Sequence, residues 1–253
     1  MGEQNYRLII SYDGTRFKGW QRLPGENTIQ GRIESALSDI FGQPIEIHGS
    51  GRTDAGVHAT GQVASFRGPR YDRSRLLSQL RHRLPEDIGI LDLDYAPERF
   101  HARLSATEKT YCYRIWNSKK PDVFGRLYRA PVPQELDTEA MERAMELCLG
   151  THDFLAFCSN KHFKKSSVRR LYEFSLRREE EELIFTLRAD GFLYNMVRIL
   201  VGTVLEVGMG QRSPDTIPAL FRSRCREDAG ETAPARGLCL MEVRYEHSDL
   251  REE

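Results

Sequence analysis

Strand-like and helix-like segments follow one another in the same order twice along this chain, and this repetition restricts the fold. In the first hundred residues the order is strand, helix, strand, strand, helix, strand. The helices begin at Thr28 and Arg73 and end before Pro44 and Pro85. The expected strands are residues 6–12, 45–48, 61–66 and 88–95. This order is typical of a split β-α-β unit of the ferredoxin-like type.

The second half repeats the architecture only in part and does not repeat the residues. The expected strands and helices are 109–116, 138–149 (helix), 168–176, 183–189, 192–207 (helix) and 238–245. The charged residues 177–182 between two strands are expected to form a solvated hairpin tip. We therefore expect an α+β fold of two ferredoxin-like halves, residues 1–105 and 106–253. The halves would form a central mixed or antiparallel sheet with the helices on one face.

The charge balance excludes some classes of protein. Lys and Arg total 37, and Asp and Glu also total 37, so the formal net charge is zero. A disordered polyelectrolyte and a uniformly cationic nucleic-acid coat are excluded, although a local basic groove is not. The longest apolar stretch, residues 199–207, contains Glu206 and is too short to span a bilayer. The N-terminal sequence lacks the pattern of a secretory signal, so we expect no association with a membrane.

The cysteines and histidines predict neither a disulfide framework nor a metal site. The chain has five cysteines, an odd number, and none of them forms a Cys-x-x-Cys pair. The seven histidines are scattered and have no partner at ligand spacing. The phosphate-binding motifs of P-loop and dinucleotide-binding proteins are also missing from the sequence. The sequence therefore predicts a reduced, cytoplasmic protein that needs no metal and no cofactor.

The sequence GSGRTDAGVHATGQVASF, residues 49–66, contains the first candidate site. Its glycine-rich turn would let the backbone approach a ligand closely, and it presents Asp54 beside Arg52. A second interpretation is a plain Thr-Asp-Ala-Gly turn in which Asp54 caps nearby N–H groups. The residues alone leave both interpretations open.

Three further residues are candidates on different elements. Arg198 lies in the apolar run FLYNMVRILVGTVLEVG, where a guanidinium needs a carboxylate partner or an anionic ligand. Tyr111 shares one face of its expected strand with Tyr113, and Leu238 begins a strand after a flexible loop. A structural ion pair for Arg198 and simple core packing for Tyr111 and Leu238 remain the alternatives.

A basic segment, SNKHFKKSSVRR at residues 159–170, carries five Lys and Arg residues and no acidic residue. Such a run is either a solvated surface or a loop that contacts phosphates.

Six blocks of sequence resemble the bacterial tRNA pseudouridine synthase A family. The most specific is GRTDAGVHATGQV, in which residues 51–59 match the family pattern G-R-T-D-x-G-V-H-A at every position. The other blocks, in the family's order, are YDGTRFKGWQ, TIQGRIESAL, FHARLSATEKTYCYRI, FLYNMVRILVGTVLEVG and APARGLCL. The resemblance implies the pseudouridine synthase fold, a homodimer, and isomerisation of uridine to pseudouridine at tRNA positions 38 to 40 in the anticodon stem-loop.

The resemblance also implies a role for each candidate residue. Asp54 corresponds to the essential catalytic aspartate, and Arg52 to an arginine that replaces the flipped nucleotide or steadies its backbone. Tyr111 corresponds to a tyrosine that stacks on the uracil ring. Arg198 corresponds to the basic residue paired with the aspartate, and Leu238 to an apolar wall of the uracil pocket.

Other functions remain as alternatives to this isomerase. A synthase of the same family could act on a different RNA, and a ferredoxin-like sheet could serve a non-catalytic RNA-binding module. Such a module has no use for Asp54, because a carboxylate repels phosphate. A metal-dependent nuclease would need several clustered acidic residues, and only Asp54 is suitably placed. Segments 118–128 and 159–170 match no family pattern, so the choice of tRNA and of position stays open.

Overall fold

The structure is a computed structural model that describes residues 2–160, 165–246 and 249–250. The chain forms two compact units, which are described separately. The N-terminal unit comprises residues 1–108 and 239–253, and the C-terminal unit comprises residues 109–238. Sequence analysis placed everything after residue 105 in one half. In the structure β10 (Leu238–Tyr245) belongs from Cys239 onward to the N-terminal unit, where it pairs in parallel with β3 (His58–Pro69).

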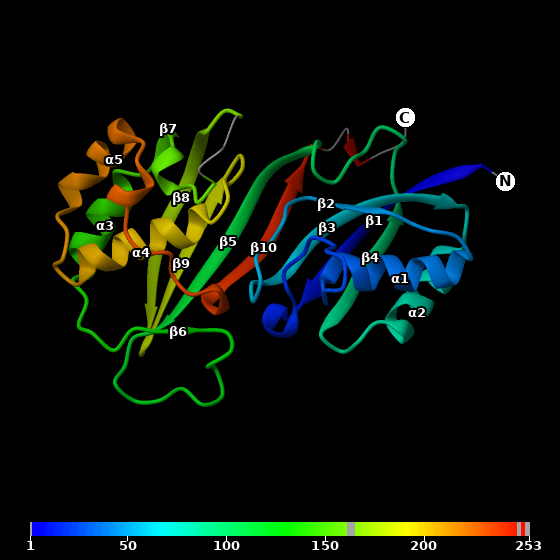
Figure 1. Cartoon of the computed structure of the whole chain (residues 1–253), viewed down its shortest axis with the longest axis horizontal. Coiled ribbons are helices and arrows are strands. Elements are labelled where there is room, and N and C mark those ends of the chain that lie inside the picture. Colours follow the sequence, from blue (N-terminus) through cyan, green and yellow to red (C-terminus); the bar gives the residue numbers. More distant parts are fainter. Residues whose placement is uncertain (1, 161–164, 247–248, 251–253) are drawn as a thin grey trace. The chain divides into compact units, whose positions relative to one another are not determined.

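The N-terminal unit has the expected β-α-β-β-α-β order (Figure 1). Its elements are β1 (Glu3–Tyr12), α1 (Ile29–Phe41), β2 (Ile47–Gly49), β3, α2 (Arg73–Arg83) and β4 (Ile88–Tyr95). The sheet order is β4-β1-β3, and β1 is antiparallel to both neighbours. The other edge of β3 is shared: β10 pairs with its first residues, and β2 pairs antiparallel with residues 64–66.

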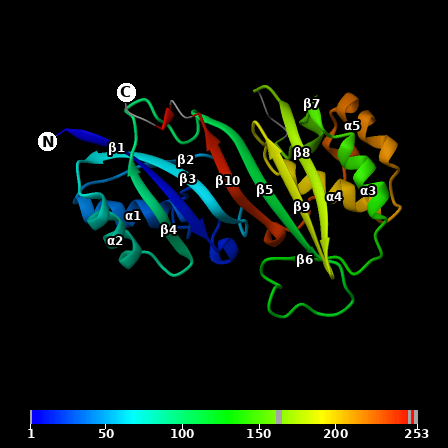
Figure 2. The same cartoon turned by 180° about the vertical axis from the view of Figure 1, so that it is seen from behind.

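Local signals explain the ends of α1. The Thr28 side chain accepts a hydrogen bond from the Gly31 N–H and caps the first turn. Gly42 follows the helix with φ 68°, a left-handed conformation that suits glycine. Helices α1 and α2 lie on one face of the sheet (Figures 1 and 2). The buried rings of Tyr6 and Phe66 stack in the core of this unit, with centroids 4.7 Å apart.

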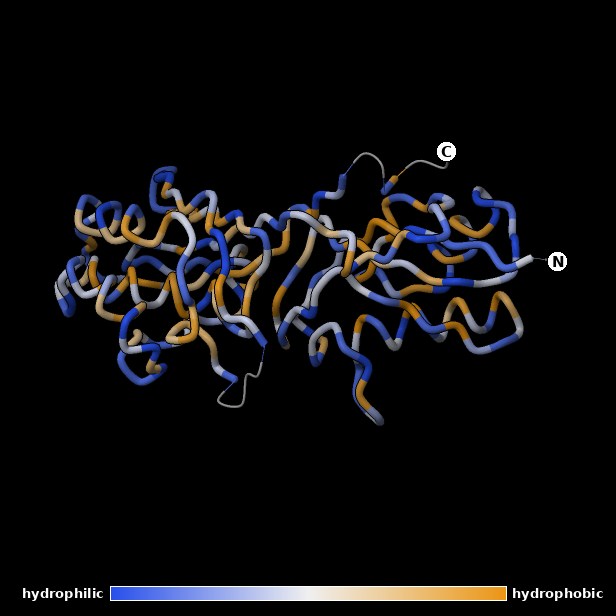
Figure 3. The backbone as a smooth tube through the Cα atoms, turned by 90° about the horizontal axis from the view of Figure 1, so that it is seen from above, coloured by the Kyte–Doolittle hydropathy of each residue, from blue (hydrophilic) through white to orange (hydrophobic). Residues whose placement is uncertain are grey.

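The strands of the C-terminal unit follow the order β5-β9-β8-β7, and each is antiparallel to its neighbours in this order. Its main elements are β5 (Ala106–Trp116), β6 (Ala130–Pro131), α3 (Thr138–Glu146), β7 (Gly150–Asp153), β8 (Val168–Glu179), β9 (Glu182–Ala189), α4 (Met196–Gly208) and α5 (Ile217–Ser223). Strand β6 pairs in parallel with β5. Hydrophobic and hydrophilic residues alternate along the backbone of both units (Figure 3). The predicted α+β class is confirmed.

Helix α4 begins four residues later than the apolar run predicted. Asn195 precedes it with φ 62°, a left-handed conformation that cannot continue a right-handed helix. The helix is otherwise almost entirely buried. At Gly202 a Cβ would overlap the Glu231 carbonyl oxygen, so the absence of a side chain lets the loop after α5 pack against the helix.

The hairpin between β8 and β9 differs in one respect from the expected solvated tip. The turn itself is exposed, with Glu180 at φ 51°. Glu182, however, is only 8% exposed and forms ion pairs of 3.2 Å with both Arg114 and Arg129. Two arginines from neighbouring segments therefore compensate a buried carboxylate that the charge pattern had placed in solvent.

The basic segment is only partly described. Lys161 and Lys164 lie outside the described residues. Arg169 and Arg170 belong to β8, so this end of the segment is strand and not loop. Within the described part of the chain, we find no helix with both the length and the apolar character of a membrane span.

Candidate functional site

The loop that carries Asp54 connects β2 to β3 and is held in place by buried hydrogen bonds. The hydroxyls of Thr53 and Tyr12 lie 2.8 Å apart, and both side chains are buried. Gln62 on β3 donates to the Gly51 carbonyl oxygen at 3.0 Å and accepts from the Ser50 hydroxyl at 2.7 Å. Satisfied buried polar groups of this kind hold a loop in one conformation.

The segment after β1 supports the same loop from another side. The backbone N–H of Trp20 donates a hydrogen bond to the Thr53 carbonyl oxygen at 3.0 Å. Gly19 has φ 89°, and a Cβ there would lie 2.7 Å from that oxygen. At Gly14 a Cβ would overlap the Val57 carbonyl. The two backbones approach so closely that only glycine fits at these positions.

We expect Gly19→Ala to lower activity at least about tenfold, because the added Cβ pushes the Asp54 loop out of place. The matched control is Gly25→Ala. Gly25 also has a positive φ, 74°, but a Cβ there would meet no atom within 4 Å. Both variants share a backbone strain of about 1–2 kcal/mol. Steady-state kinetics and thermal unfolding of the pair separate strain from displacement. Equal activities of the two variants would contradict this role of Gly19.

The two predicted residues of this loop differ in exposure. Asp54 is half-buried, directly after the buried Thr53, whereas Arg52 is exposed. The Val57 N–H donates a hydrogen bond to the backbone carbonyl oxygen of Asp54 at 3.1 Å, and this bond closes the turn. A half-buried carboxylate on a rigid loop can reach a ligand while its backbone stays fixed.

Tyr111 lies on β5 in the C-terminal unit, 7% exposed, opposite Leu187 of β9. The rings of Tyr111 and Phe192 pack edge to face, with centroids 5.1 Å apart and an interplanar angle of 88°. Tyr113 shares its face, and its hydroxyl donates to the Pro234 carbonyl oxygen at 2.7 Å. Burial raises the pKa of the Tyr113 hydroxyl, which therefore stays protonated and able to donate.

Arg198 lies in the first turn of α4 and is half-buried. Its Nε donates to the Ala233 carbonyl oxygen at 2.7 Å, and its Nη1 donates to Asn195 Oδ1 at 3.1 Å. The Ala233 N–H donates in return to the Arg198 carbonyl oxygen at 3.1 Å. Sequence analysis expected a carboxylate or an anionic ligand at this guanidinium. The two bonds described here are to neutral oxygens, and they fix the direction of the guanidinium plane.

Leu238 follows the short 3-10 turn Ala235–Gly237 and is 6% exposed. A Cβ at Gly237 would lie 2.7 Å from the Tyr113 ring, so the turn packs directly on β5. Residues 233–238 thus connect three predicted residues within this unit. They bond to Arg198, pack on the strand of Tyr111 and end at Leu238.

Sequence reasoning missed several residues that hold these groups in place. They are Tyr12, Gly19, Trp20 and Gln62 in the N-terminal unit and Tyr113, Asn195, Ala233 and Gly237 in the C-terminal unit. Their signal in the sequence is weak, because a strand tyrosine or a loop glycine has many ordinary uses. Among the residues that the structure describes, no three His, Cys, Asp or Glu side chains are grouped so as to hold a metal ion.

A match to a protein-family model identifies the class of protein to which this α+β fold and its aspartate-bearing loop belong. The family model described as tRNA pseudouridine synthase matches residues 8–104 and 144–246, which is most of the chain. The chain belongs to this family of tRNA-modifying isomerases.

Three relatives of this chain share one name, tRNA pseudouridine synthase A. The tRNA pseudouridine synthase A of Halalkalibacterium halodurans is 47% identical, with 91% of this chain and 89% of the relative covered. The enzyme of the same name from Acetivibrio thermocellus is 45% identical, with 96% and 100% covered. That of Bacillus sp. (strain KSM-64) is 43% identical, with 95% and 99% covered.

Proposed function

We propose that this chain isomerises uridine to pseudouridine in the anticodon stem-loop of tRNA, at positions 38 to 40. The observation that carries the proposal is the similarity to tRNA pseudouridine synthase A of 42–47% identity over nearly the whole chain. The rigid support of the Asp54 loop agrees with it, because a catalytic carboxylate needs a fixed position relative to the reacting atoms.

The reaction moves one bond within a single nucleoside. The N1–C1′ bond breaks, the uracil turns, and a C5–C1′ bond forms. C5 then loses its proton and N1 gains one, so atoms and electrons balance without an oxidant or a reductant. Asp54 is the proposed catalytic carboxylate. It attacks C1′, attacks C6 or abstracts a proton from the sugar, and all three routes need it ionised.

The other candidate residues are proposed to hold the flipped nucleotide. Extruding a stacked base costs a few kcal/mol, and stacking on an aromatic ring such as Tyr111 returns about 1–3 kcal/mol. Leu238 would form an apolar wall beside the uracil. Arg198, already oriented by Ala233, would favour the charged form of the catalytic carboxylate. The exposed Arg52 would take the place of the flipped nucleotide or steady its backbone.

Mapping the modified position tests the proposal. Unmodified tRNA transcripts are incubated with the protein, treated with a carbodiimide that marks pseudouridine, and read by primer extension. We expect stops that report positions 38 to 40. Stops only at other positions would indicate a different RNA target. Tight binding without any stop would indicate a non-catalytic RNA-binding module.

We also propose a cytoplasmic homodimer in which one subunit holds the tRNA while the anticodon arm enters the site of the other. The support is the family resemblance, together with the length of tRNA relative to a chain of 253 residues. Sedimentation velocity at micromolar concentration should give the mass of two chains. A monomer under these conditions would contradict this assembly.

A further inference from the structure

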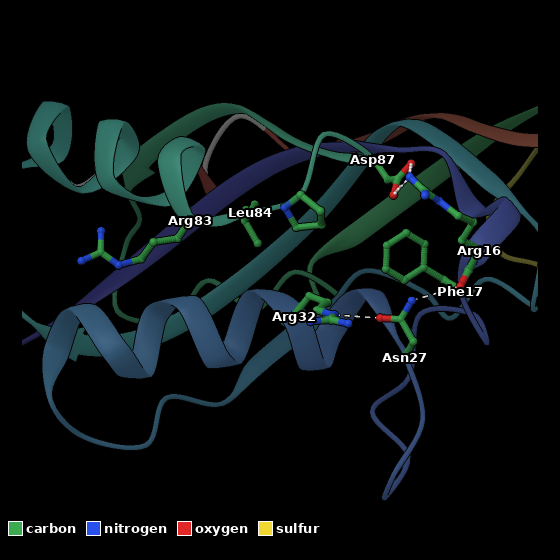
Figure 4. A pocket seen from close by; sticks show the side chains of 8 residues that line it. Arg16, Phe17, Asn27, Arg32, Arg83, Leu84 and Asp87 are labelled. Atoms are coloured by element: carbon green, nitrogen blue, oxygen red, sulfur yellow. Dashed lines mark hydrogen bonds and ion pairs between the residues drawn. The ribbon is translucent and has the colours of Figure 1, made fainter.

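The N-terminal unit contains a pocket of about 450 Å³ that the candidate residues do not use (Figure 4). It is lined by Arg16, Phe17, Asn27, Arg32, Arg83, Leu84, Pro85 and Asp87. These residues come from the segment after β1, the start of α1, and the end of α2 with the turn that follows it. The floor is apolar, because the buried Phe17 and Leu84 lie beside Pro85, and the rim carries three arginines.

Two of the arginines are oriented by neighbouring side chains. Asn27 Oδ1 accepts from Arg32 Nε at 2.7 Å, while its Nδ2 donates to the Arg16 carbonyl oxygen at 3.0 Å. Arg16 Nη2 lies 2.9 Å and 2.7 Å from the two carboxylate oxygens of Asp87. Figure 4 draws these contacts as dashed lines. Within the described residues each guanidinium uses one nitrogen in these bonds, so its other N–H groups can bind a ligand.

The charge of the pocket favours an anion. The lining includes three arginines and one carboxylate, Asp87, and Figure 4 shows the Arg83 side chain directed away from Arg16 and Arg32. The neighbouring Glu86 is highly exposed and lies 3.9 Å from Arg16. Guanidinium groups bind phosphate oxygens through paired N–H donors, and they do so best when already oriented. The apolar floor offers Phe17, Leu84 and Pro85 to a ribose or a base. This combination fits a phosphate with its attached nucleoside better than it fits a bare anion.

The pocket shares a wall with the support of the Asp54 loop. Arg16 and Phe17 line the pocket, while Gly14 and Gly19 on the same short segment pack against the backbone of the loop. A polymer bound in the pocket would therefore contact the same short segment that packs against the loop of the catalytic carboxylate.

We infer that this pocket binds a backbone phosphate and its nucleoside in the tRNA substrate, and that Arg16 and Arg32 hold the phosphate. The inference rests on the proposed function. Such a contact positions the RNA without reading its sequence. It affects binding of tRNA and not the chemical step.

The test is the double variant Arg16→Gln and Arg32→Gln, assayed on full-length tRNA. Each lost phosphate contact weakens binding several-fold at physiological salt, so KM for tRNA should rise roughly tenfold or more. The slope of log K against log salt should become shallower by about 0.7–0.9 for each contact. The rate at saturating tRNA should stay within about twofold of the parent. Both side chains are exposed, so thermal unfolding should show an intact fold.

The matched control is Arg75→Gln, an exposed arginine in the first turn of α2, away from the pocket. An unchanged KM and salt slope in the double variant would overturn the inference, as would equal changes in the control. A lower saturating rate with unchanged KM would also overturn it. Pseudouridine formation by the parent protein is measured in the same assay, so a failure of this inference is distinguishable from a failure of the proposed function.

Discussion

Asp54→Asn is expected to reduce pseudouridine formation by at least about 10⁴-fold and to leave tRNA binding within about twofold of the parent. The amide keeps the shape of the side chain but removes its charge and its ability to attack carbon or accept a proton. The loop should hold its conformation, since the hydrogen bonds of Thr53, Gly51 and Trp20 to neighbouring segments remain in the variant. Single-turnover assays and filter binding on the same tRNA measure the two quantities.

Two further variants make this expectation specific. Asp39→Asn places the same change on the exposed face of α1 and should retain full activity. Asp54→Ala controls for slow deamidation of the introduced amide back to aspartate, and it should be equally inactive. Turnover by Asp54→Ala at a substantial fraction of the parent rate would remove Asp54 from the mechanism.

Arg198→Ala is expected to lose activity by at least about 100-fold and also to lower the stability of the protein. The substitution removes the charge-assisted hydrogen bond to the Ala233 carbonyl oxygen and the bond to Asn195. The loss of such bonds costs about 1.5–3 kcal/mol. For a chain of this size that corresponds to a decrease in Tm of roughly 5 °C. Calorimetry measures the second effect independently of the first.

The conservative variant Arg198→Lys separates the two roles. Lysine keeps the positive charge but lacks the planar fork that binds Ala233 and Asn195 together. We therefore expect partial activity with a loss of stability close to that of the alanine variant. Full activity in Arg198→Ala would show that this guanidinium is not needed at the catalytic carboxylate.

Much of the fold follows from local sequence patterns. Residues 88–95 and 238–245 match β4 and β10 at both ends, because turn residues or proline bound each alternating run. The start of α4 is four residues late, because Asn195 adopts a left-handed conformation that hydropathy does not reveal. The short strands β6 and β7 and helix α5 were missed, since two to seven residues carry too little periodicity.

The candidate site shows a similar division. The motif around Asp54 and the isolated charge of Arg198 are visible in the sequence, because they conflict with ordinary core packing. The residues that fix them are not visible. The contact between Gly19 and Thr53 and the bond from Tyr113 to Pro234 join segments distant in the sequence, and only the folded structure reveals them. The burial of Glu182 among charged neighbours was hidden for the same reason.

The most direct test of the account is release of tritium from tRNA labelled at C5 of uridine. Pseudouridine formation joins C5 to C1′, so the C5 hydrogen must leave to water. We expect the parent protein to release the label from the uridines of the anticodon stem-loop and Asp54→Asn to release none above background. No release by the parent on an intact, folded tRNA, or equal release by Asp54→Asn, would contradict it.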